Sequence, residues 1–122
     1  MRRILLAFPT PSAAESLSLV LGTTGVQLSI ARSQVAMIDE LLRGDYALLL
    51  TGYLAPFVGG GDLVGRLSQR ATPRPTIFVI SHLRSEHSLM ALYESGVDQF
   101  ISVPLSPPRL LRKVIEELRA RP

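Results

Sequence analysis

Short apolar runs alternate along the chain with longer stretches that have helical spacing, and this alternation occurs five times. Three of the runs are uniformly apolar, which is typical of parallel strands buried on both faces. They cover residues 4–8, 46–50 and 76–80. Two further runs, residues 26–30 and 99–103, alternate between apolar and polar positions, which indicates strands with one solvated face.

The helical stretches between these runs carry recognisable start signals. Ser12 and Glu15 have the spacing of a capping box, so we expect the first helix to begin there. Suitable N-cap residues precede three of the other helices: Ser33, Ser85 and Ser106. The run Gly59-Gly60-Gly61-Asp62 opens the third helix. Pro107 and Pro108 fit the first turn of the last helix, where they forfeit no hydrogen bond. The triple glycine at 59–61 predicts a mobile linker before the third helix.

Strands that alternate with helices in this way require a parallel sheet with right-handed crossovers. The second and fifth strands have a solvated face and belong at the edges, while the three apolar strands belong in the centre. These constraints select the strand order 2-1-3-4-5 in a three-layer, doubly wound α/β fold. We expect a single domain over residues 1–122.

Composition narrows the chemistry available to this domain. The chain has no cysteine, which excludes disulfides and thiolate metal sites, and His82 and His87 have no acids at ligand spacing. The net charge of +3 comes from scattered residues, so we expect no direct contact with nucleic acid. No apolar run is long enough to cross a membrane. The run at 4–8 is also too short for a signal peptide, and we expect a cytoplasmic protein.

Three segments resemble one known family. Residues 91–106, ALYESGVDQFISVPLS, are similar to an "A-L-x-A-G-A-D-x-[YF]-[LI]-x-K-P-[FL]" run, and residues 45–50, DYALLL, to a "D-L-V-L-L-D" third strand. Residues 75–81, PTIFVIS, resemble a fourth strand that ends in serine or threonine. Over nearly its whole length the chain resembles the CheY-like receiver domain of bacterial response regulators. The resemblance implies the flavodoxin-like receiver fold.

The resemblance also implies a phosphorylation site, whose residues are mostly missing. A receiver needs two acids after the first strand to hold Mg²⁺, an aspartate nucleophile ending the third strand, a hydroxyl after the fourth and a lysine before the proline of the fifth. The corresponding positions and their neighbours are Phe8, Pro9, Thr10, Leu50, Thr51, Ser81 and Val103. Only Ser81 keeps its type. We therefore interpret the chain as a degenerate pseudo-receiver without metal or cofactor, its former pocket filled by Phe8 and Leu50.

The family's usual partner and dimer surface consists of the fourth helix, the fifth strand and the fifth helix. Aromatic and arginine side chains suit such a contact surface. The candidates here are Arg84, Leu89, Tyr93, Phe100, Leu105, Arg109 and Arg112. We expect Phe100 itself to be an edge-strand aromatic packed on the last two helices.

These features favour a non-enzymatic signalling module that acts by protein contact and without phosphorylation, as a homodimer or against a partner or output domain. The last residues, 116–122, look like a helix running into a linker, so we expect the N-terminal part of a longer regulator, such as one with a DNA-binding domain.

Two alternatives stay open. A module that binds a small molecule or nucleotide phosphate would hold it beside Thr10 and Ser81. A receiver that is still phosphorylated would use Thr51 or Ser81 as its acceptor. We interpret Ser81 as a hydroxyl at a strand end and not as a nucleophile with His82, because neighbours on an extended segment point in opposite directions.

Overall fold

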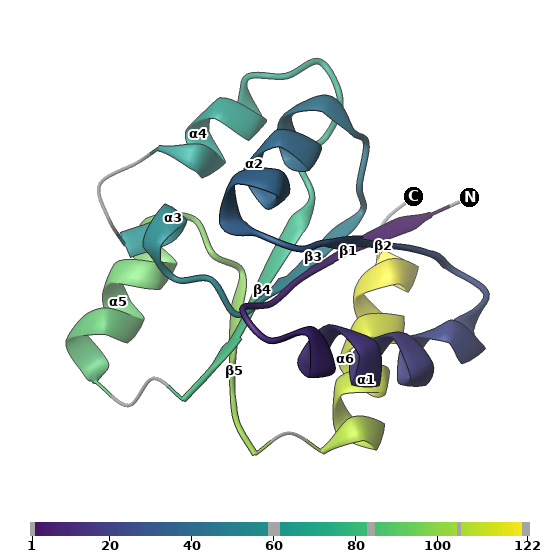
Figure 1. Ribbon diagram of the computed structural model, residues 1–122. Coiled ribbons are helices and arrows are strands. Elements are labelled where there is room, and N and C mark those ends of the chain that lie inside the picture. The colour runs from purple at the N-terminus through teal and green to yellow at the C-terminus, as the bar shows by residue number, and fades with distance from the viewer. Residues whose placement is uncertain (1, 59–61, 83–84, 105, 121–122) are drawn as a thin grey trace.

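A five-stranded parallel sheet forms the centre of the computed structural model, which describes residues 2–58, 62–82, 85–104 and 106–120. The strand order is β2-β1-β3-β4-β5, so the predicted order 2-1-3-4-5 is confirmed (Figure 1). The strands are β1 Arg3–Ala7, β2 Gln27–Ala31, β3 Leu48–Thr51, β4 Thr76–Ser81 and β5 Gln99–Ser102.

Helices cover both faces of this sheet, which makes three layers. Figure 1 shows α1 and α6 on one face and α2, α3, α4 and α5 on the other. Their bounds are α1 Pro11–Leu21, followed by the short 3-10 helix η1 Gly22–Thr24, then α2 Gln34–Arg43, α3 Ala55–Val58, α4 Leu63–Ser68, α5 Glu86–Glu94 and α6 Pro107–Ala120. Within the described ranges, no helix has the length and apolar character needed to cross a bilayer.

Two apolar cores form because neighbouring strand residues point to opposite faces. Leu50 packs with Leu110 of α6 in one core, and Leu49 packs with Leu92 of α5 in the other. All four residues of β3 are buried, whereas every residue of β5 is partly or fully exposed. The sequence predicts this difference, because a uniformly apolar run indicates a central strand and an alternating run indicates an edge strand. Only a central strand is fully buried on both faces of the sheet.

Side-chain caps begin three of the helices, and those at Ser33 and Ser85 are as predicted. The hydroxyl of Ser33 accepts a hydrogen bond from Ala36 N, the carboxylate of Asp62 accepts one from Gly65 N, and Ser85 Oγ accepts one from Ser88 N. Each of these bonds satisfies a backbone N–H that has no partner inside the helix. Residues 59–61, for which a linker was expected, lie outside the described residues.

The predicted capping box is wrong. Helix α1 begins at Pro11, one residue before Ser12, and its N-cap is Thr10, which makes no side-chain cap hydrogen bond. The ring of Pro11 already fixes φ near the helical value, and a proline has no N–H for a cap to satisfy. The helix can therefore start at the proline without the box.

Helix α3 is an element that the sequence pattern did not predict. It is a single turn, Ala55–Val58, between β3 and α4, and it buries Pro56 and Phe57. A segment of four residues is too short to show helical periodicity. The turn matters for the site because it fixes the chain that leaves β3 beside the carboxyl ends of the strands.

Candidate functional site

The carboxyl ends of the strands meet at one edge of the sheet, as parallel strands require. Thr51, the last residue of β3, pairs with Ala7 of β1 on one side and with Val79 of β4 on the other. Val103 N, just past β5, donates to Ser81 O over 3.2 Å. The predicted pocket residues are thus brought to one edge, the place where doubly wound sheets usually bind ligands.

The end of β3 carries no carboxylate, the group that a receiver phosphorylates. Leu50 is 0% exposed and packs in the same core as Leu6 and Phe78. Thr51 is also 0% exposed, and its Oγ1 accepts a hydrogen bond from Tyr53 N over 3.0 Å. A leucine has no nucleophilic atom, and this threonine hydroxyl is buried in a local turn.

The loop after β1 also lacks the groups that hold Mg²⁺. Phe8 is buried, and its carbonyl accepts a hydrogen bond from the hydroxyl of Tyr53 over 3.4 Å. Pro9 and Thr10 are exposed and carry no carboxylate. In the described part of the chain, no group of three or more histidine, cysteine, aspartate or glutamate residues is placed to bind a metal ion.

A hollow of about 510 Å³ lies at this edge, and we call it the strand-end hollow. Its lining includes Phe8, Thr10, Ser16, Leu17, Ile80, Ser81, His82 and Val103. The expectation that Phe8 and Leu50 fill the former pocket is therefore only half right. Both side chains are buried, but space remains beside Phe8, between α1 and the ends of β4 and β5.

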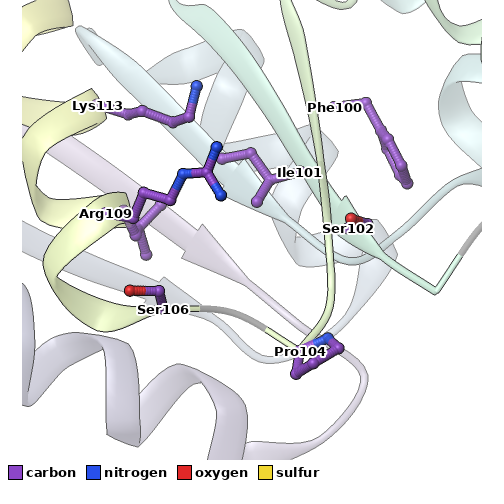
Figure 2. Close-up of a pocket in the computed structure, with 8 residues that line it drawn as sticks. Phe100, Ile101, Ser102, Pro104, Ser106, Arg109 and Lys113 are labelled. Atoms are coloured by element: carbon purple, nitrogen blue, oxygen red, sulfur yellow. The ribbon is translucent and has the colours of Figure 1, made fainter.

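A second depression of about 240 Å³ runs between β5 and α6. Figure 2 shows Arg109 and Lys113 reaching from α6 toward β5 on the side of Ile101, with Phe100 on the opposite side of the strand. Lys113 Nζ donates to Gln99 Oε1 over 3.3 Å. Lys113 was missed in the sequence, although its spacing of four from Arg109 places both cations on one helix face.

The side chains predicted for the partner surface lie on α5, β5 and α6. Tyr93 is 47% exposed, and its hydroxyl accepts a hydrogen bond from Phe100 N over 3.1 Å, which satisfies one backbone donor of the edge strand. Leu89 is half-buried and Arg109 and Arg112 are exposed, while Arg84 and Leu105 lie outside the described residues.

An exposed apolar side chain on α5 was missed. Met90 is 61% exposed on the same helix as Tyr93. Its helical position close to Tyr93 is the signal that could have found it.

Phe100 packs on one of the two last helices and not on both. It lies against the core that contains Leu92 of α5, whereas its neighbour Ile101 lies against the core that contains Leu110 of α6. The cause is the strand geometry, which sends adjacent side chains to opposite faces.

A polar network lies at the opposite, amino edge of the sheet. Tyr46 is buried, donates to Glu40 Oε2 over 2.6 Å and accepts from Arg3 Nη2 over 3.1 Å. The Arg3 guanidinium also lies 4.4 Å from the centre of the Tyr46 ring, a cation–π contact. Burial, and then the hydrogen bond with Glu40, raise the pKa of Tyr46 above its ordinary value of 10.0.

Asp98 makes a second network at that edge. Its carboxylate accepts two hydrogen bonds from Arg74, over 2.9 and 3.1 Å, and a third from Ile77 N over 2.8 Å. The residue before β5 is therefore bound to the start of the neighbouring strand β4. Asp98 stabilises the backbone at the amino edge and does not lie at the carboxyl edge, where the candidate site is.

Comparison with known proteins gives one consistent result. No protein-family model and no curated protein matches the chain. Solved receiver structures do match it, at low identity. A CheY-like response regulator receiver domain protein from Methanospirillum hungatei JF-1 is 20% identical, with 98% of this chain and 95% of that chain covered and a TM-score of 0.81.

Two more structures agree. A response regulator from Desulfuromonas acetoxidans is 19% identical, with both chains covered over 100% and a TM-score of 0.80. An orphan response regulator of H. pylori is 16% identical, with 97% of each chain covered and a TM-score of 0.77. At these identities the similarity establishes the fold alone, because one fold can host many functions. The chain has the flavodoxin-like fold of response regulator receiver domains.

Proposed function

We propose that this domain is a pseudo-receiver: a non-enzymatic signalling module that works by protein contact and does not depend on phosphorylation. The observation that carries the proposal is Leu50, a fully buried apolar residue at the end of β3 where the resemblance places the nucleophile. Phe8 and Pro9 at the acid positions and Val103 at the lysine position support it further.

The surface that we propose for contact consists of α5, β5 and α6, through Leu89, Tyr93, Phe100, Arg109 and Arg112, together with Arg84 and Leu105 from the sequence analysis. The exposed ring of Tyr93 and the exposed guanidinium of Arg109 are the types of side chain that carry binding energy at interfaces. A second copy of the chain, forming a homodimer, is the occupant that we favour.

The sequence analysis also supplies a proposal for the domain organisation and the location of the protein. We propose one domain over residues 1–122 in a cytoplasmic protein, as the N-terminal part of a longer regulator that carries an output such as a DNA-binding domain. In this arrangement the output domain makes the contact with nucleic acid. The pseudo-receiver contributes the protein contact and uses no cofactor.

An NMR titration of backbone amides tests independence from phosphorylation. Mg²⁺ and then beryllofluoride, a mimic of an acyl phosphate, are added to the isolated domain and to a phosphorylatable receiver as a positive control. We expect the amide resonances of Phe8, Thr10, Leu50, Thr51 and Ser81 to stay unchanged in this domain while the corresponding resonances of the control shift. Saturable shifts that spread to Phe100 would overturn the proposal.

Sedimentation across a concentration series tests the proposed homodimer. We expect Tyr93→Ala to weaken self-association. The matched control is Leu19→Ala, which removes a side chain of 80% exposure from α1, on the face of the sheet opposite α5, the helix that carries Tyr93. A monomer at every concentration, or equal effects of the two variants, would exclude this surface as the dimer contact.

The alternative with an unorthodox acceptor finds little support at the carboxyl edge. Thr51 is fully buried, and Ser81 is half-buried beside residues that supply no carboxylate for a metal ion. Intact-mass measurement after incubation with acetyl phosphate tests it, because a gain of one phosphoryl group at either residue would revive it. The small-molecule alternative has a specific observation in its favour, the strand-end hollow.

A further inference from the structure

The strand-end hollow has the size and the place of a ligand site. Its volume of about 510 Å³ falls inside the range of roughly 300–1,000 Å³ that is usual for small-molecule pockets. It opens at the carboxyl ends of β1, β4 and β5, the edge at which open α/β sheets bind ligands. Its lining comes from the strand ends, from the loops that follow them and from helix α1.

The wall of the hollow is apolar and carries no permanent charge. Phe8, Leu17, Ile80 and Val103 supply large apolar surfaces. Among the lining residues that the structure describes, none is aspartate, glutamate, lysine or arginine. A phosphate or another anion placed here would lose its hydration without gaining a cationic partner, which is costly. The wall therefore suits a neutral ligand.

A few polar side chains also line the strand-end hollow. Ser81 is half-buried, Thr10 is exposed, and both line the hollow. Over the described part of the chain, neither side chain has a hydrogen-bond partner. His82 also lines the hollow. A mainly apolar cavity with a few hydrogen-bonding groups is the usual composition of a site for a small organic molecule.

We infer that the strand-end hollow binds a neutral, mostly apolar small molecule that offers one or two hydrogen-bonding groups to Ser81 and Thr10. Val103 is central to this inference, because it places an isopropyl group where the resemblance expects a lysine. Binding itself does not depend on the proposed function. Only the idea that the ligand acts as a signal in place of phosphate rests on the proposed function.

A pair of fluorescent probes tests the charge preference. Neutral N-phenyl-naphthylamine and anilinonaphthalene sulfonate share one aromatic skeleton and differ by an anionic group. We expect saturable binding of the neutral probe and binding of the sulfonate that is weaker by about tenfold or more, because the sulfonate would be buried without a cation. Amide shifts at Phe8, Thr10, Ser81 and Val103 would locate the bound probe.

Two variants and one control make the test specific. Ser16→Trp adds an indole to the α1 wall and is expected to weaken binding of the neutral probe by about tenfold or more. Leu19→Trp adds the same group to the same helix, at a position that is 80% exposed and does not line the hollow, so it should leave binding unchanged. Val103→Lys restores the cation and is expected to reverse the preference toward the sulfonate.

Three outcomes would overturn the inference. These are equal or tighter binding of the sulfonate by the natural chain, equal effects of the two tryptophan variants, and the absence of amide shifts at the hollow. None of them bears on phosphorylation. A response to beryllofluoride would contradict the proposed function and leave the probe result standing, so the two failures are distinguishable.

Discussion

The two edges of the sheet differ in how they treat charge. At the amino edge, Tyr46 bonds with Arg3 and Glu40, and Asp98 joins Arg74 to the backbone of Ile77. At the carboxyl edge, where a receiver places its acids and its lysine, the chain has apolar side chains around an open hollow. Polar contacts at the amino edge connect neighbouring strands, whereas the carboxyl edge contains the strand-end hollow.

This contrast separates the architecture of a receiver from its chemistry. The polar contacts at the amino edge bind loop to strand and are needed whatever the domain does. The carboxyl edge can lose its charges without loss of the fold, because Leu50 and Phe8 join an apolar core that extends to α1 and α6. The same fold can thus persist while the residues at its carboxyl edge differ.

Leu50→Asp should have the largest effect, because it places a carboxylate in the apolar core. We expect a loss of about 2–5 kcal/mol in the free energy of unfolding at pH 7. Burial raises the pKa of the new carboxyl in the folded state, so the loss should grow as pH rises above about 4. Urea unfolding at several pH values measures it.

The matched control at this position is Leu50→Asn, a neutral side chain of similar shape to the aspartate, whose effect should not vary with pH. If the aspartate and asparagine variants are equally stable at pH 7, then water or an ion reaches residue 50. The carboxyl edge would then be less apolar than its packing indicates.

Asp98→Ala should come next, because it removes the acceptor shared by Arg74 and Ile77 N. A hydrogen bond to a charged group contributes about 1.5–3 kcal/mol, and we expect a loss at the lower end because the aspartate is 34% exposed. Asp98→Asn keeps an oxygen for Ile77 N and should lose less. Chemical denaturation compares the three proteins, and an unchanged stability in Asp98→Ala would show that this network does not hold the strands.

Tyr46→Phe should have the smallest effect, about 1 kcal/mol, because it removes a hydroxyl and keeps the ring that lies beside Arg3. The raised pKa of Tyr46 means that its stabilising effect is complete below pH 10 and is lost as pH rises through the folded-state value. The difference in unfolding free energy between the natural chain and the variant should therefore narrow above pH about 10.

Urea unfolding at pH 8 and at about pH 11 measures this narrowing. A gap that widens with pH would show that the hydroxyl ionises more easily in the folded state than in the unfolded chain, opposite to the effect of burial.

The order of apolar and polar residues predicts the sheet correctly, because the residue types of each strand show whether it is buried on one face or on both. The caps Ser33, Asp62 and Ser85 were predictable for a similar reason, since a cap depends on residues only three apart. Helix α3 was not predictable, because one turn has no period. The pairing of Tyr46 with Arg3 spans 43 positions, a distance at which no local rule applies.

By itself the sequence determined the strand order and the identity of the side chains at each strand end, because both follow from residue type and alternation. It therefore excluded an aspartate nucleophile at Leu50. Only the tertiary structure decided that Thr51 is buried and that a hollow remains beside Phe8. The reason is physical: the space between helix α1 and the strand ends depends on how whole elements pack, and no single segment encodes it.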